Sequence, residues 1–233
     1  MRKKFRERSL KYYLRENTHV MKKIVLSTCL FLFTLSVFSQ TKLYLHPQAE
    51  SYAKATETIA ILPLRVQVNL RPKELKDFTP EQIVQMGKDE SLDIQKGMHT
   101  WFLKRKQRGD LSSTVQNPAR TNALLIKAGY DIHNLDLLTP SELGQILGVD
   151  CVISGSLETS KPMSGAAALG ALVIGFAGAT NSATCNLDFY NTEDDELVVN
   201  YYKTVRGGLG SNSQDLINVL MRKVTRRIPY TSS

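Results

Sequence analysis

Three histidines beyond the N-terminal region, His46, His99 and His133, are the side chains best suited to bind a metal or transfer a proton near neutral pH. They are far apart in the sequence and form neither an HExxH motif nor another paired spacing typical of a metal site. The acidic run Glu193–Glu196 offers oxygen ligands for calcium but lacks the spacing of an EF-hand loop. The pattern predicts an exposed hairpin turn at this run and no metal site.

Two short segments resemble parts of catalytic or phosphate-binding motifs. Ser154-Gly155-Ser156 is not a nucleophile elbow, because the GxSxG pattern is missing. The loop Gly207–Ser213 precedes a predicted helix, but it lacks GK[ST], and Ser213 replaces the third glycine of GxGxxG. A turn followed by a helix cap explains this loop. Asp150 and Asp188 are single carboxylates without an identifiable partner, so the sequence predicts no catalytic residue, no cofactor and no enzyme activity.

The segment 21–39 has the three parts of a secretory signal peptide. Met21 and two lysines are followed by the apolar run Ile24–Phe38, and small residues at the end predict cleavage before Gln40. The run is shorter than the roughly twenty apolar residues of a helical membrane span. The protein is therefore expected to be exported, to the periplasm or the outer membrane. Residues 1–20 are expected to be an upstream extension, read from too early a start.

The formal net charge of +8 comes mainly from the N-terminal region. Nine of the 30 basic residues and two of the 22 acidic residues precede residue 40, which leaves 21 basic and 20 acidic residues in 40–233. The mature chain is close to neutral, so the composition does not favour nucleic acid as a partner. Its length suits a single domain with a substantial core.

The cysteines predict neither a lipid anchor nor a disulfide. Cys29 lies inside the apolar run and follows Thr28, where a lipoprotein signal needs a small residue and a full apolar run before the cysteine. Cys151 and Cys185 lie near the starts of two predicted strands. If these strands form a hairpin, the two thiols lie at opposite ends of the ladder, too far apart to bridge. Both are expected to be small core residues.

Helix and strand signals predict an α/β fold. Thr79, Asn117 and Thr139 each precede a proline, the arrangement of a helix N-terminus, and two of the three sites complete a capping box. The first helix is expected to end near Arg108 with basic residues that suit the helix dipole, either as a solvated terminus or as a DNA-binding cluster. The predicted order is β-α-β-α-α-β-β-β-α, a two- or three-layer sandwich with a mixed β-sheet. Residues 40–57 are expected to be a loose lead-in to a domain at 58–230.

One segment, 164–180, consists of uncharged apolar or small residues. It is short for a helical span, and it lacks both the alternation of a membrane β-strand and a clean GxxxG repeat. Three interpretations remain open: a buried or flexible loop, a membrane-touching or oligomerising segment, and a helix packed on the domain. The residues expected to make any contact are Gly165, Leu169, Gly170, Leu172, Ile174, Gly175, Phe176 and Gly178.

Two motifs resemble a module of bacterial envelope proteins. They are IAILPL at residues 59–64 and the helix-strand unit SELGQILGVDCVISGS at 141–156. The pair resembles two motifs shared by the N-terminal domain of TolB, the curli secretion channel subunit and the lipoprotein activators of penicillin-binding proteins. The Gln40 cleavage site and the closing residues 223–230 are similar to secreted proteins of Bacteroidetes. The resemblance implies an envelope α/β domain with a non-enzymatic, partner-binding role.

Three hypotheses follow for the function. The first is an exported module that binds an envelope protein, or a second copy of itself, through the sheet edge or through 164–180. The second is an oligomeric, membrane-associated channel or scaffold subunit, which requires 164–180 to enter lipid. The third is an enzyme, which only a polar pocket with converging titratable groups would support.

Overall fold

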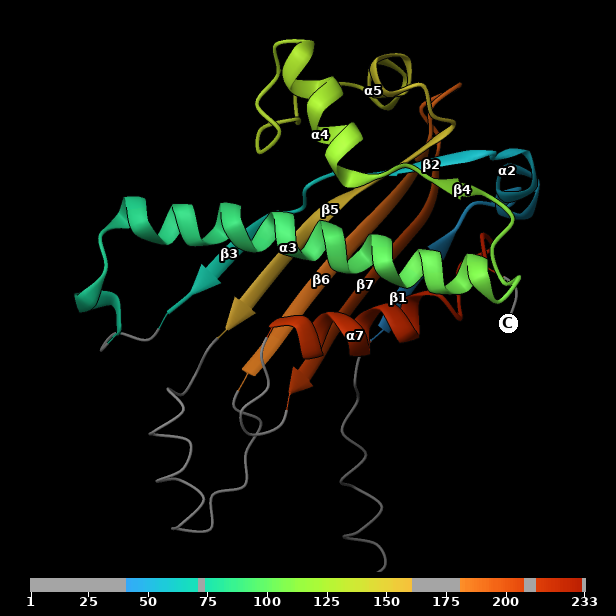
Figure 1. Ribbon diagram of the computed structural model, residues 1–233. Helices are drawn as coiled ribbons and strands as arrows, with labels where there is room; N and C mark the ends of the chain where they lie inside the picture. Colours follow the sequence, from blue (N-terminus) through green and yellow to red (C-terminus); the bar gives the residue numbers. More distant parts are fainter. Residues whose placement is uncertain (1–40, 71–73, 161–180, 208–212, 232–233) are drawn as a thin grey trace, which may run out of the picture. The chain divides into compact units, whose positions relative to one another are not determined.

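A mixed seven-stranded sheet lies at the centre of the fold (Figure 1). The computed structural model describes residues 41–70, 74–160, 181–207 and 213–231. The strands run in the spatial order β1-β7-β6-β5-β2-β4, and β3 also pairs with β5. Their bounds are β1 Thr41–Leu45, β2 Thr58–Ile61, β3 Arg65–Asn69, β4 Thr114–Val115, β5 Cys151–Ser160, β6 Asn181–Asn191 and β7 Leu197–Gly207.

The sheet combines a parallel part and an antiparallel part. Strands β2 and β3 both run parallel to β5, β2 beside its first half and β3 beside its second half, and β4 runs parallel to β2. Pro63, which has no N–H to donate, lies between β2 and β3. Strands β5, β6, β7 and β1 are antiparallel neighbours. The mixed sheet predicted from the sequence is confirmed.

Helices lie on both faces of the sheet. Helices α3 and α7 cross one face, and α4 and α5 lie at the end where β5 begins (Figure 1). Ile59 and Ile61 of β2 belong to the core under α3 and α7, whereas Ala60 packs with α4 and α5. This alternation is the period of two expected for a strand covered on both faces. The helices are α2 Ala49–Ala55, the 3-10 turn η1 Glu74–Asp77, α3 Pro80–Gln107, α4 Pro118–Lys127, α5 Pro140–Leu147 and α7 Ser213–Val224.

In the described part of the chain, the long antiparallel strands are covered on one face along most of their length. In β6, residues 183, 185, 187 and 189 are buried, and the residues between them are half-buried. The buried face packs on α3 and α7 around Met98, Phe102, Phe189 and Tyr201, all fully buried. The opposite face carries polar side chains, among them Arg65 of β3, Ser154 and Ser156 of β5, Asp188 of β6 and Asn200 of β7, and we call it the polar face. One covered and one solvated face are typical of antiparallel sheets.

The predicted helix ends are confirmed. Thr79 and Thr139 each cap their helix in a complete capping box, and the Asn117 side chain accepts from the Ala119 N–H at 2.8 Å. Gly148 ends α5 with a φ of +65°, a left-handed conformation that glycine adopts without strain. The long first helix ends at Gln107, close to the predicted residue.

The basic residues at the end of α3 are not simply solvated. Arg105 forms a largely buried ion pair with Asp110 at 2.9 Å. Lys106 donates to the backbone oxygens of Ser112 and Ser113. The cluster therefore holds the chain between α3 and β4 against the helix end, a role that neither sequence interpretation included.

Three elements differ from the sequence prediction. The expected lead-in instead forms strand β1 and helix α2. Strand β3 was not expected, although the alternating sequence Arg65–Asn69 fits a strand. The strand expected after the first helix is only the two-residue β4, Thr114 and Val115. Short edge strands depend on their neighbours for stability, so local patterns identify them poorly.

The prediction for the two strand cysteines is confirmed. Cys151 lies opposite Asn191 at one end of the β5–β6 ladder, and Cys185 lies opposite Leu157, toward its other end. Both are buried free thiols. Burial raises the pKa of Cys151 to about 12 and also raises the pKa of Cys185, because an apolar surrounding disfavours the thiolate.

No helix in the described part of the chain is both long and apolar enough to cross a membrane. The predicted signal peptide at 21–39 and the segment 164–180 lie outside the described residues, and so do the contact residues predicted in that segment. The limits predicted for the domain stay a prediction.

Candidate functional site

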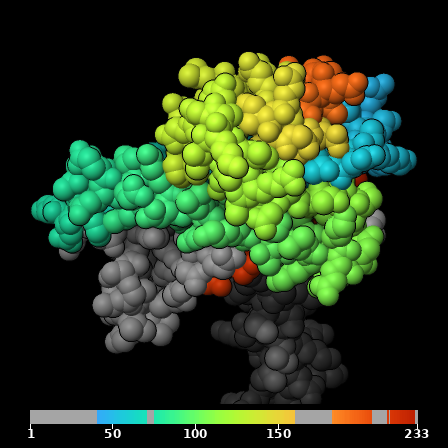
Figure 2. Space-filling view, turned by 45° about the horizontal axis from the view of Figure 1, so that its top comes forward, coloured from blue at the N-terminus to red at the C-terminus, as the bar shows by residue number. Residues whose placement is uncertain are grey.

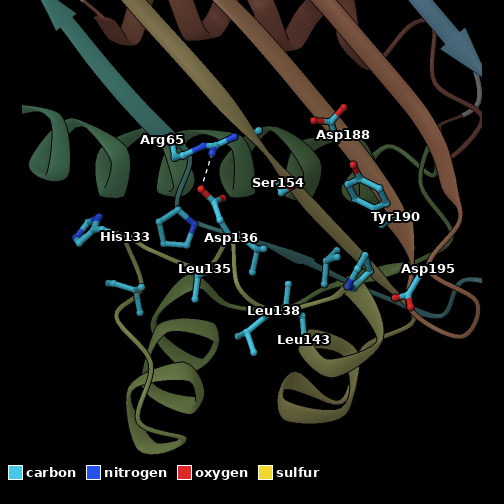
Figure 3. Close-up of a pocket in the computed structure, with 16 residues that line it drawn as sticks. Arg65, His133, Leu135, Asp136, Leu138, Leu143, Ser154, Asp188, Tyr190 and Asp195 are labelled. Atoms are coloured by element: carbon cyan, nitrogen blue, oxygen red, sulfur yellow. Dashed lines mark hydrogen bonds and ion pairs between the residues drawn. The ribbon is translucent and has the colours of Figure 1, made fainter.

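A cleft opens beside the polar face, where the chain between α4 and α5 meets strands β3, β5 and β6 (Figure 3). Its volume is about 310 Å³, at the lower end of the range for small-molecule pockets. One wall is apolar and the other is polar. The polar wall contains Arg65, His133, Asp136, Ser154, Asp188, Tyr190 and Asp195.

The apolar wall comes mainly from residues 128–139. Gly129 has a φ of +90° just after α4 and lets the chain turn there. Ile132, Leu135 and Leu138 then pack on the small core formed by β2, β5, α4 and α5. Figure 2 shows this segment and α5, in yellow-green and yellow, beside the orange β6–β7 turn. The wall is therefore fixed by the same packing that seats the two helices.

Arg65 and Asp136 form an ion pair across the mouth of the cleft, with 2.6 Å between Arg65 Nη1 and Asp136 Oδ2 (Figure 3). Both side chains are well exposed, 64% and 59%. Pairs of this kind contribute at most about 1 kcal/mol to stability. The pair links β3 to the α4–α5 segment and leaves the cleft open.

Asp188 lies on β6 inside a small amide network. Its carboxylate accepts from Asn186 Nδ2 at 3.0 Å and from Asn200 Nδ2 at 2.5 Å. Desolvation raises the pKa of Asp188, while the hydrogen bond from Asn200 and the charge of Arg65 lower it in part. The result is a half-buried carboxylate held in one orientation on the cleft wall.

Ser154 lies directly opposite Asp188 in the β5–β6 ladder, and Tyr190 lies two residues along on the same face of β6 (Figure 3). Gly155, the next residue of β5, has a φ of +149°, and a Cβ there would lie 2.0 Å from the Asn186 oxygen. The two strands approach so closely here that only glycine fits. The positions of the oxygen atoms on this wall are therefore set by the register of the β5–β6 ladder.

A second exposed surface is the edge of the sheet at β1. Within the described residues, β1 pairs only with β7, through the register Leu43 to Tyr201. Leu43, Tyr44 and Leu45 are exposed by 38%, 46% and 43%. Apolar side chains on an uncovered edge strand are unusual, because such edges pair readily with other chains.

The residues singled out in the sequence are mostly dispersed. His46 Nδ1 accepts from the Gln48 N–H, His99 is half-buried with a pKa lowered by desolvation, and His133 lies at the cleft. Among the described residues, no three His, Cys, Asp or Glu side chains are grouped to hold a metal ion. The acidic run Glu193–Glu196 lies at the β6–β7 turn, as predicted.

The carboxylates expected to lack partners have them. Asp150 Oδ2 accepts from the backbone N–H groups of Glu57 and Thr58, at 2.9 and 2.8 Å, and so fixes the start of β2. Asp188 has the amide partners described above. The alternating polar residues on β6 and β7 were the signal that could have placed Asp188 beside Asn200, but only with the strand register known.

No protein-family model and no curated protein sequence matches this chain. Among solved structures, it is similar to lipoprotein GNA1162 from Neisseria meningitidis, with a TM-score of 0.43 and 11% identity over 73% of this chain and 96% of that one. For the PelC dodecamer from Paraburkholderia phytofirmans, the TM-score is 0.44 and the identity is 11%, over 83% of this chain and 98% of that one. For the LpoB C-terminal domain from Escherichia coli, the TM-score is 0.33 and the identity is 10%, over 68% of this chain and 93% of that one.

Likenesses this weak carry no argument about function. None of these three structures is a TolB or curli-channel protein, so that part of the sequence resemblance stays a prediction.

Proposed function

We propose that this chain is an exported, non-enzymatic binding module of the cell envelope, and that it holds an extended segment of an envelope protein along strand β1. The observation that carries the proposal is the exposed apolar edge formed by Leu43, Tyr44 and Leu45. An extended segment can add to such an edge through backbone hydrogen bonds, while its alternate side chains contact the exposed ones.

The backbone of β1 suits this mode of binding. The His46 N–H donates to the Val198 oxygen at 2.9 Å. Ladder hydrogen bonds in an antiparallel pair use every second residue of a strand, so the groups of Tyr44 point toward β7. Those of Leu43 and Leu45 point away from β7, toward the edge. A partner strand would find donors and acceptors beside two exposed leucines.

The polar cleft is the observation closest to an active site, but its carboxylates already have structural partners. Asp136 pairs with Arg65, Asp188 accepts from two asparagines, and Asp195 accepts from Ser141. This arrangement supports ligand binding over acid–base catalysis.

The test is site-specific photo-crosslinking in whole cells that produce the full chain. A photoreactive residue at Tyr44 should give a discrete adduct with an envelope protein, and one at Leu103 should not. Leu103 lies on α3 with a similar exposure, 45%. The adduct should disappear in Leu43→Pro, which removes an edge-facing N–H without removing a bond to β7.

Each result has a definite meaning. Adducts that depend on Leu43 and contain an envelope protein support the proposal. Adducts that contain only a second copy of this chain would replace the partner with a homo-oligomer. Equal adducts at Tyr44 and Leu103, or none at either position, would overturn the proposal.

A further inference from the structure

The cleft beside the polar face plays no part in binding at β1, and its walls suit a ligand of a particular kind. Its apolar wall offers the side chains of Ile132, Leu135, Leu138, Leu143 and Val152. Its polar wall offers oxygen atoms of Ser154, Asp188 and Tyr190 (Figure 3). A ligand that fills it needs an apolar body and a polar end.

The polar end must be a hydrogen-bond donor. A carboxylate has about four acceptor positions, and Asp188 uses two of them for Asn186 and Asn200. The hydroxyls of Ser154 and Tyr190 can also accept. Three acceptors on neighbouring positions of one sheet face match the three N–H groups of an ammonium ion.

The polar end is also expected to be positively charged. Arg65, the cation whose field reaches Asp188, is bound to Asp136 at 2.6 Å. The ion pairs of the described part of the chain join Arg65 to Asp136, Lys96 to Asp93 and Arg105 to Asp110, and none involves Asp188. The negative charge at the centre of the polar wall therefore has amide partners but no cation in contact.

We propose that this cleft binds a terminal alkylammonium group, with the ammonium at Asp188, Ser154 and Tyr190 and the alkyl chain against Leu135 and Leu138. The source is either a free aliphatic amine or a lysine side chain of another protein, since both present the same end. The proposal is independent of the β1 edge, and either can fail without the other.

The probe is n-pentylamine, titrated into the full chain and followed by calorimetry and by nuclear magnetic resonance. Its neutral and anionic analogues, 1-pentanol and pentanoate, have nearly the same alkyl body. The amine should bind about tenfold or more tightly than either analogue, because a hydrogen bond to a charged group is worth about 1.5–3 kcal/mol. This comparison uses only the unmodified protein.

Asp188→Asn should weaken pentylamine binding by about tenfold or more, for the same reason. The matched control is Asp194→Asn, which makes the same change of charge in the β6–β7 turn, where Asp194 bonds Tyr52 rather than facing the cleft. Circular dichroism should show that both variants fold. Two further probes distinguish the two sources of the ammonium group. The compound 1,5-diaminopentane represents a free amine, and Nα-acetyl-lysine N-methylamide imitates a lysine within a protein chain.

Binding of the lysine mimic equal to that of pentylamine supports a protein lysine, and binding of the free amines alone supports a free amine. Equal binding of pentylamine and 1-pentanol would overturn the proposal. So would equal weakening by Asp188→Asn and Asp194→Asn, because a nonspecific loss of negative charge would then explain the effect.

Discussion

Asp195 in the β6–β7 turn accepts hydrogen bonds from both the backbone N–H and the hydroxyl of Ser141, at 2.6 and 3.1 Å. Ser141 is in the first turn of α5, where backbone N–H groups have no partner inside the helix. The turn thus supplies an acceptor that the helix itself lacks. It also joins α5, which helps to line the cleft, to the end of the hairpin that carries Asp188.

Replacing Asp195 should therefore destabilise the whole fold. Asp195→Ala should lower the free energy of unfolding by about 1–2 kcal/mol, as for the loss of a helix N-cap. Asp195 has a φ of +61°, a conformation that asparagine tolerates better than alanine does. Asp195→Asn, which keeps an acceptor oxygen, should lower the free energy of unfolding by less than Asp195→Ala does. Urea unfolding measures both values, and equal losses would show that the hydrogen bonds contribute little.

Among the glycines that the structure describes, Gly155 should be the least tolerant of a side chain. In Gly155→Ala, the new Cβ would collide with the Asn186 oxygen. The free energy of unfolding should therefore fall by about 3 kcal/mol or more. The control is Gly148→Ala, whose Cβ meets nothing within 4 Å. This change should lower the free energy of unfolding by only about 1 kcal/mol, because the backbone there has a positive φ. Thermal unfolding gives the comparison, and similar losses would contradict the close approach of β5 and β6.

Much of the fold could be predicted because its signals are local. The pairs Thr79 with Gln82 and Thr139 with Glu142 lie three residues apart, and both form the predicted capping boxes. Ile94, Met98 and Phe102 recur at helical spacing and are buried together. Strand β1 could not be predicted in this way. Its side chains stay exposed, and its place depends on pairing with β7, far away in the sequence.

The cleft could not be predicted because its residues come from separate segments. Arg65 lies in β3, Asp136 lies between α4 and α5, and Asp188 lies in β6. Each looks like an isolated surface charge in the sequence. Strand pairing brings them together, and a shift of one residue in the β5–β6 register would turn Asp188 to the core. Register is a property of the whole sheet, which a single sequence does not reveal.

The stability of the protein should depend on pH through Asp188. Because its pKa is raised in the folded state, folding favours its protonated form, and this contribution is present at low pH and lost as the pH rises through the raised pKa. The free energy of unfolding of the native chain relative to Asp188→Asn should therefore be lower at pH 7 than at pH 4. Urea unfolding at both pH values tests this. A difference that grows with pH would mean that the network favours the ionised form.

Cys151 and Cys185 should react with iodoacetamide only when the fold opens. Both thiols are buried, and burial raises the pKa of Cys151 to about 12, so the reactive thiolate is almost absent at pH 8. Native protein should stay unmodified at both sites, and protein in concentrated urea should be modified at both. Mass spectrometry of the separate peptides measures each site and keeps Cys29 apart. Rapid modification of either thiol in the native protein would show that this strand opens without global unfolding, which the continuous β5–β6 ladder argues against.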